Sequence, residues 1–134
     1  MTGNSMNTIT KLLRELGIAC AEYQDRTLRD LPTERLECDE TWSYVAAKAK
    51  NVPEEHAGEF GWGDVWTWVA VDQDSRLIVS WLVGSRDEWS AREFMGDIRS
   101  RCPNRLQITT DGHRPYIDAI ERTFGANVDF AQLI

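Results

Sequence analysis

Long apolar runs, paired cysteines and a surplus of basic residues are all missing from this chain of 134 residues. No stretch approaches the roughly 18 apolar residues that span a membrane, so we expect no membrane partner. The three cysteines, Cys20, Cys38 and Cys102, are far apart and form no C-x-x-C pair. That spacing argues against a zinc site or a disulfide framework and favours the reducing cytoplasm. Residues 1–7 also lack the basic-then-apolar pattern of a secretion signal.

The scarcity of positive charge bears on DNA binding. The net charge is -7, and residues 36–134 carry ten basic and seventeen acidic groups, whereas residues 1–35 carry five of each. Affinity for duplex DNA comes mostly from Lys and Arg on phosphates, so the charge balance alone argues against a nucleic-acid partner. A metal-dependent nuclease, however, needs local acid to hold its cations. The composition therefore keeps that class open and places the main DNA contact elsewhere.

The first part of the chain predicts helices and a linker. Residues 5–16 carry an apolar stripe, Ser5 can cap a helix there, and Gly17 can end it. Residues 19–28 predict a second, weaker helix. Residues 31–33 (LPT) predict a linker, because proline disfavours helix in the residue before it.

The remainder predicts a single α/β domain, a size that suits one hydrophobic core. Residues 48–63 predict a loop, and helices are expected over 87–101 and from Pro115 to Gly125. Strands are expected over 35–45, 64–71, 76–83, 105–110 and 128–134. Hairpins make the first three strands antiparallel, and helical crossovers make the last two parallel. The expected fold is a mixed five-stranded sheet with flanking helices, preceded by a short helical segment, which is the ribonuclease-H-like order.

Two aspartates are candidates for metal binding. Asp39 belongs to the polar face of the first predicted strand, and Asp111 ends the fourth. These strands are neighbours in the expected sheet, so the two carboxylates can share a cation. Phosphodiester cleavage uses two divalent cations roughly 3.5–4 Å apart, and Mg²⁺ prefers carboxylate oxygens. A plainer interpretation remains open: an Asp before Gly is often a turn residue, and Asp39 could lie on a solvated face.

The other acids near these positions are weaker candidates. Glu40 follows Asp39 directly, but strand alternation turns its side chain to the opposite face, so it ranks below the two aspartates, as a helper. His113 is expected to be a surface histidine, with contact to substrate as the alternative. Asp118 and Glu121 are expected on the wet face of their helix.

Several segments resemble transposases of the insertion sequence one family, in order and through nearly the whole chain. The first catalytic block of that family is similar to residues 38–45 (CDETWSYV), and residues 7–17 (NTITKLLRELG) resemble its DNA-recognition helix. Further similar runs are GDVWTWVA (63–70), LVGSRD (82–87), TTDGH (109–113) and VDFAQLI (128–134).

The resemblance implies DNA transposition by a DDE transposase, in which a strand is cut and the freed 3′-hydroxyl attacks target DNA. It implies that Asp39 and Asp111 are the first two catalytic metal ligands and that Mg²⁺ or Mn²⁺ is the cofactor. The implied partners are transposon-end and target DNA, with a second copy of the chain or a full-length transposase as a further possibility. A nucleoid-associated, cytoplasmic protein is expected.

The resemblance also implies a chain truncated at both ends. The zinc-binding start and first helix of the family's helix-turn-helix would precede Met1, and its third carboxylate, a Glu, would lie beyond Ile134. Residues 1–34 are then the remnant of the recognition helix with a linker, and residues 35–134 are the ribonuclease-H-like catalytic domain without its C-terminal part. Two alternatives to an incomplete enzyme stay open: a non-catalytic DNA-binding or dimerising regulator of transposition, and a decayed remnant.

Overall fold

A computed structural model describes residue 3 and residues 5–133 of the chain. Within these residues three α-helices and two short 3-10 turns accompany five strands. In chain order the elements are α1 (Met6–Thr27), β1 (Arg35–Val45), η1 (Ala49–Asn51), η2 (Glu54–His56), β2 (Gly63–Asp72), β3 (Ile78–Gly84), α2 (Glu88–Arg101), β4 (Leu106–Thr110), α3 (Pro115–Phe124) and β5 (Val128–Gln132).

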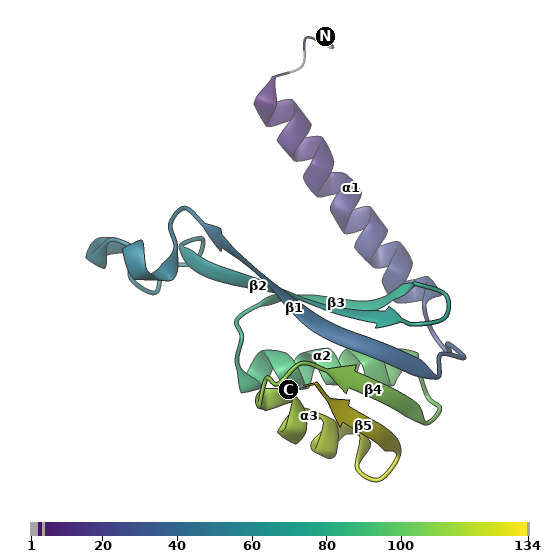
Figure 1. The fold of residues 1–134 in the computed structure, drawn as a ribbon. Coiled ribbons are helices and arrows are strands. Elements are labelled where there is room, and N and C mark those ends of the chain that lie inside the picture. Colours follow the sequence, from purple (N-terminus) through teal and green to yellow (C-terminus); the bar gives the residue numbers. More distant parts are fainter. Residues whose placement is uncertain (1–2, 4, 134) are drawn as a thin grey trace.

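The strands form one sheet in the order β3-β2-β1-β4-β5 (Figure 1). β1 pairs antiparallel with β2, and β2 pairs antiparallel with β3. β4 lies parallel to both β1 and β5. This arrangement confirms the mixed α/β sheet expected from the sequence and is consistent with a ribonuclease-H-like fold. The central position of β1, between β2 and β4, determines where the candidate site lies.

The hydrophobic core lies between the sheet and the helices α2 and α3. Every second residue of the inner strands contributes to this core, because successive side chains of a strand alternate between the two faces of the sheet and these point to the face covered by helices. The fully buried members include Leu36, Trp68 and Ile108 from strands and Phe94 and Met95 from α2. Ring centroids of Trp68 and Phe94 are 5.8 Å apart, which fixes α2 over the middle of the sheet.

Helix α1 is one continuous helix and corrects the prediction that Gly17 ends a first helix. Ser5 caps it as expected, with its hydroxyl accepting from the Thr8 amide at 3.2 Å. Glycine in a helix interior costs only about 1 kcal/mol relative to alanine, and Gly17 keeps helical geometry because the residues on both sides are good helix formers. No residue of α1 is buried, and the helix projects away from the sheet (Figure 1). Among the described residues, no helix has the length and apolar character needed to cross a membrane.

Only the end of α1 is tied to the domain. The Arg101 guanidinium, at the end of α2, donates to the Gln24 and Leu28 carbonyls at 3.4 and 3.2 Å and to Asp25 at 3.0 Å. It also donates to the Asp97 carboxylate at 2.7 and 3.0 Å. This buried arginine therefore joins the C-terminal turn of α1 to α2.

Two boundaries differ from the sequence expectation. The third strand begins at Ile78 rather than at residue 76, because Arg76 has a φ of 64° and turns the chain away from an extended path. The expected loop over residues 48–63 contains η1 and η2 at the far end of the long β1–β2 hairpin (Figure 1).

Candidate metal centre

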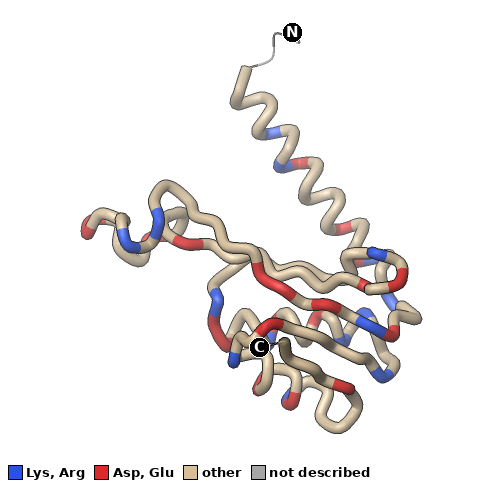
Figure 2. The backbone as a smooth tube through the Cα atoms, viewed as in Figure 1, with Lys and Arg blue, Asp and Glu red and all other residues tan. Residues whose placement is uncertain are grey.

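The end of the β1–β4 ladder places Asp39 and Asp111 beside each other. The parallel pairing stops at Cys38, which lies opposite Thr110. Asp39 and Asp111 are the next residues on the two strands, so their carboxylates lie where β4 ends while β1 continues. In Figure 2 the backbone tube is red, the colour of Asp and Glu, along this part of β1. The expected closeness of the two aspartates is observed, since each offers an oxygen to a group whose members lie within 4.8 Å of one another.

Glu40, a weaker candidate in the sequence, also joins this group. Among the described residues, Asp39, Glu40 and Asp111 each place one carboxylate oxygen within 4.8 Å of the other two. Alternation does turn Glu40 toward the helix-covered face, the face of Leu36 and Cys38. However, β1 has no β4 neighbour beyond Cys38. Side chains from both faces of β1 can therefore meet at the open edge of the strand.

Glu40 is buried without a hydrogen-bond partner. Its side chain is 1% exposed, and neither carboxylate oxygen has a partner within hydrogen-bond geometry. Burial, then the nearby charge of Asp111, raises the pKa of Glu40 to about 7, and Arg86 opposes that rise. A buried carboxylate with two free oxygens is costly to maintain, because each unpaired polar group keeps its desolvation penalty.

Among the residues that the structure describes, Arg86, in the segment between β3 and α2, is the one cation in contact with two of the acids. Its Nη2 donates to Asp111 Oδ2 at 3.1 Å and lies 3.7 Å from Glu40 Oε2. Its guanidinium carbon lies 4.8 Å from the centroid of the Trp66 ring, a cation–π distance. Arg86 thus supplies a single positive charge at the edge of the cluster.

His113 and Tyr116 close the inner side of the cluster. The side chain of His113 is 12% exposed, which corrects the expectation of a surface histidine, and its Nε2 lies 3.9 Å from Glu40 Oε1. Burial, then Arg86, lowers the pKa of His113 below its usual value, so the ring is neutral near pH 7. The Tyr116 hydroxyl lies close enough to Glu40 to oppose slightly the rise of its pKa, but it forms no hydrogen bond of normal geometry. Both rings contact Trp68, at centroid distances of 5.7 and 5.4 Å.

Asp39 faces solvent at the mouth of the site. Its Oδ1 accepts from the Glu40 amide at 2.8 Å, which holds the carboxylate against the strand. Asp111 Oδ1 accepts from the His113 amide at 3.0 Å, an Asx-type turn that orients it similarly. An open hollow of about 320 Å³ lies over both aspartates, between residues 37–39 of β1, the end of β4 and Leu133. A solvated ion therefore has a direct path to these oxygens.

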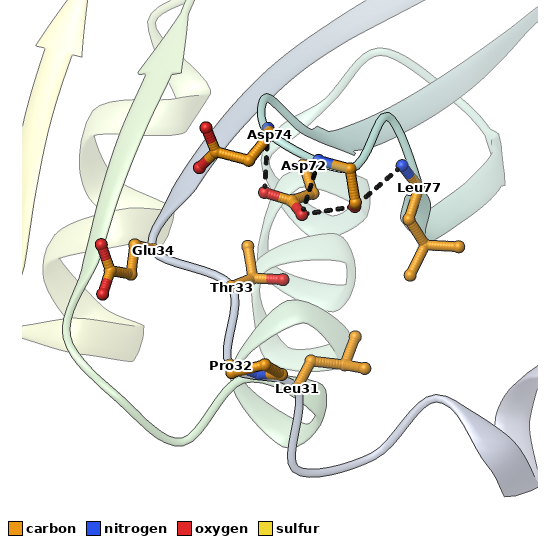
Figure 3. Close-up of a pocket in the computed structure, with 8 residues that line it drawn as sticks. Leu31, Pro32, Thr33, Glu34, Asp72, Asp74 and Leu77 are labelled. Carbon is orange, nitrogen blue, oxygen red and sulfur yellow. Dashed lines mark hydrogen bonds between the residues drawn. The ribbon is translucent and has the colours of Figure 1, made fainter.

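A second acidic hollow, at the start of β1, lacks these features (Figure 3). It measures about 300 Å³ and lies between residues 31–34 and the β2–β3 turn. There the Asp72 carboxylate accepts from the Asp74 and Ser75 amides at 3.4 and 3.3 Å and from the Ser75 hydroxyl. The Ser75 hydrogen bond is the main reason why the pKa of Asp72 lies below its usual range. Asp72 thus closes a turn, whereas Glu40 has no such partner.

The late acids of the chain have other roles. Asp118 accepts from Arg92 and Arg122 at 2.9 and 2.7 Å on the exposed face of α3, as expected. Asp129 pairs with Arg105 at 2.6 Å. Neither belongs to the acidic group beside Asp111.

Comparison with known proteins agrees with this geometry. A family model described as a DDE domain matches residues 61–131, just over half of the chain. The chain belongs to the DDE transposase family. No curated protein matches it. A transposase domain supports a role in transposition and implies DNA and a divalent metal as partners, and the match includes Asp111 but begins after Asp39 and Glu40.

Proposed function

We propose that this DDE transposase domain acts in metal-dependent cleavage and transfer of DNA strands, with Asp39 and Asp111 as two ligands of a Mg²⁺ or Mn²⁺ ion. One observation carries the proposal: carboxylates from β1 and from the end of β4 come within 4.8 Å of one another beneath an open hollow.

The donor set fits a hard divalent cation. Mg²⁺ and Mn²⁺ favour carboxylate oxygens together with water. Here the oxygens come from residues of a rigid sheet, and the solvent-exposed side leaves room for water and phosphate. The unpaired oxygens of Glu40 mark a deficit of positive charge at the same point. When bound, such a cation stabilises the charge that develops on attacking and leaving phosphate oxygens.

The chain's own residues have separate roles in this proposal. Asp39 and Asp111 hold the cation, and the amides of Glu40 and His113 orient their carboxylates. Arg86 stands at the rim of the site, where its guanidinium can pair with a DNA phosphate. Because the domain is acidic overall, DNA is repelled from the cluster until cations neutralise it.

Calcium-dependent DNA binding tests the proposal without requiring turnover. Ca²⁺ takes the same oxygen ligands as Mg²⁺, with a looser geometry. We expect Ca²⁺ to strengthen binding of a fluorescein-labelled duplex, measured by anisotropy against an EDTA control, and we expect Asp39→Asn and Asp111→Asn to lose that gain.

Glu121→Gln is the matched control, because it removes one carboxylate charge from an exposed position of α3 that lies outside the acidic group. Retention of the calcium effect in both site variants, or its absence from the parent chain, contradicts the proposal.

We also propose that residues 1–34 form a DNA-binding segment with a linker, separate from a catalytic domain over residues 35–134. The support is the exposure of α1: Ile9, Leu12, Leu13 and Leu16 form an apolar stripe that contacts no part of the described core. Such a stripe suits a helix that packs within a multi-helix unit. If the proposal is right, a chain that begins at residue 35 stays folded by circular dichroism and loses DNA affinity measured in EDTA. Unchanged affinity contradicts it.

A further inference from the structure

We propose that Glu40 is a third ligand of the metal bound by Asp39 and Asp111, completing a three-carboxylate centre inside this chain. The inference rests on the proposed function for the two aspartates and adds a residue that the sequence pattern ranked below them. It gives the buried Glu40 carboxylate, which has no hydrogen bond, a second positive charge besides that of Arg86.

Unpaired polar atoms converge on this point. Among the described residues, the buried side-chain atoms without a hydrogen-bond partner are Glu40 Oε1 and Oε2, His113 Nε2 and the Tyr116 hydroxyl. All of them lie together on the inner side of the acidic group. Buried polar groups in folded proteins are nearly always satisfied, so a cluster of unsatisfied ones indicates that another group occupies the space between them.

Charge distinguishes the kind of group that fits. Three carboxylates face one guanidinium, that of Arg86, within the part of the chain that the structure describes. A bound anion would add to the excess of negative charge. A divalent cation reverses that excess, and its affinity rises with the number of carboxylate ligands.

Arg86 acts as the resident counter-ion that such a cation displaces. It contacts Asp111 and lies beside Glu40, but its stacking on Trp66 holds it at the rim of the group. It therefore satisfies one oxygen of Asp111 and leaves both oxygens of Glu40 without a hydrogen bond. Removing Arg86 takes away a competing charge while leaving all three carboxylates in place.

Binding of Mn²⁺ alone provides the test. The electron paramagnetic resonance signal of free aqueous Mn²⁺ falls as the ion binds, so a titration gives the dissociation constant without any DNA reaction. We expect Glu40→Gln to weaken Mn²⁺ binding at least about tenfold, because a charged ligand becomes neutral at nearly constant shape. Glu40→Asp should also weaken it by shortening the reach, and Arg86→Gln should tighten it.

The control is Glu121→Gln, which removes the same charge from the exposed face of α3 and should leave Mn²⁺ binding unchanged. Circular dichroism confirms that each variant is folded, and Glu40→Asp replaces Glu40→Gln if the amide variant does not fold.

Two failures are distinguishable. If Asp39→Asn and Asp111→Asn weaken binding while both Glu40 variants bind as the parent does, the aspartates hold the metal, Glu40 faces only water, and this inference is overturned. If the aspartate variants bind Mn²⁺ as the parent does, the proposed function itself is contradicted, because it names Asp39 and Asp111 as metal ligands.

Discussion

Replacing Glu40 by glutamine should stabilise the metal-free protein, although it removes a charged residue from the candidate site. The raised pKa of Glu40 determines the sign of this stability change. In the unfolded chain the carboxyl titrates near 4.5, whereas in the folded chain it titrates near 7. The folded state therefore binds more protons than the unfolded chain between these pH values. The free energy of unfolding of the parent chain consequently falls as the pH rises from about 4.5 through 7.

The size of the effect follows from the same shift. One pKa unit corresponds to about 1.36 kcal/mol, so the rise of Glu40 from 4.5 to about 7 gives an upper value of about 3 kcal/mol. Part of this is shared with Asp111, whose charge contributes to the shift. We expect Glu40→Gln to be more stable than the parent by roughly 2–3 kcal/mol at pH 8 and nearly equal to it at pH 4.5.

Urea denaturation in EDTA at both pH values measures this difference, with Glu121→Gln as the control for loss of a surface charge. Excess Mn²⁺ at pH 8 should reduce the stability difference between Glu40→Gln and the parent, or make the parent the more stable of the two. The reason is that the metal stabilises only the folded chain that binds it. A Glu40→Gln variant that is less stable than the parent at pH 8 in EDTA would show that the glutamate is satisfied in the folded state. The reasoning from its unpaired oxygens would then be wrong.

Further predictions concern the parts that hold the site in place. Arg101→Met should destabilise the protein by roughly 3 kcal/mol in urea denaturation, because it leaves Asp97 and two carbonyls of α1 without their buried partner; a change under 1 kcal/mol would contradict this. Ile108→Ala, at a fully buried position of β4, should cost about 2–5 kcal/mol by the same assay. Gly125→Ala should lower the melting temperature in calorimetry, since a φ of 53° with a ψ of -127° costs a residue with a side chain about 1–3 kcal/mol. Leu12→Ala should leave stability nearly unchanged, because its side chain is 65% exposed on α1; a large loss would place a partner on that face.

Most of the fold could be predicted from the sequence because its strands carry regular signals. Alternation of side chains between two faces indicated β1, β2 and β3 as strands. The polar turn at residues 72–75 predicted that β2 and β3 are antiparallel. Asp87 and Pro115 marked the starts of α2 and α3, since a capping aspartate and a first-turn proline act locally. The closeness of Asp39 and Asp111 followed from sheet order alone.

Other features depend on contacts that no local pattern records. Glycine is common at helix ends, so Gly17 predicted the end of a helix. Whether α1 continues through it depends on the residues on both sides of Gly17. Strand alternation ranked Glu40 below the aspartates, and its side chain does point to the opposite face, but the carboxylates still meet at the unpaired edge of β1. The register at which β4 stops, opposite Cys38, opens that edge, and register cannot be read from one strand. The burial of His113 likewise depends on Trp68, forty-five residues earlier in the chain.

The central claim is that the acids at the open end of the β1–β4 pair hold a divalent cation. Anomalous diffraction from a crystal soaked in Mn²⁺ tests it most directly, because the signal locates the ion without reference to activity. We expect a peak within coordination distance of the Asp39 and Asp111 carboxylates, with a Glu40 oxygen as the third ligand. A fully soaked crystal with no peak at this cluster, or with Mn²⁺ only at other sites, would contradict it.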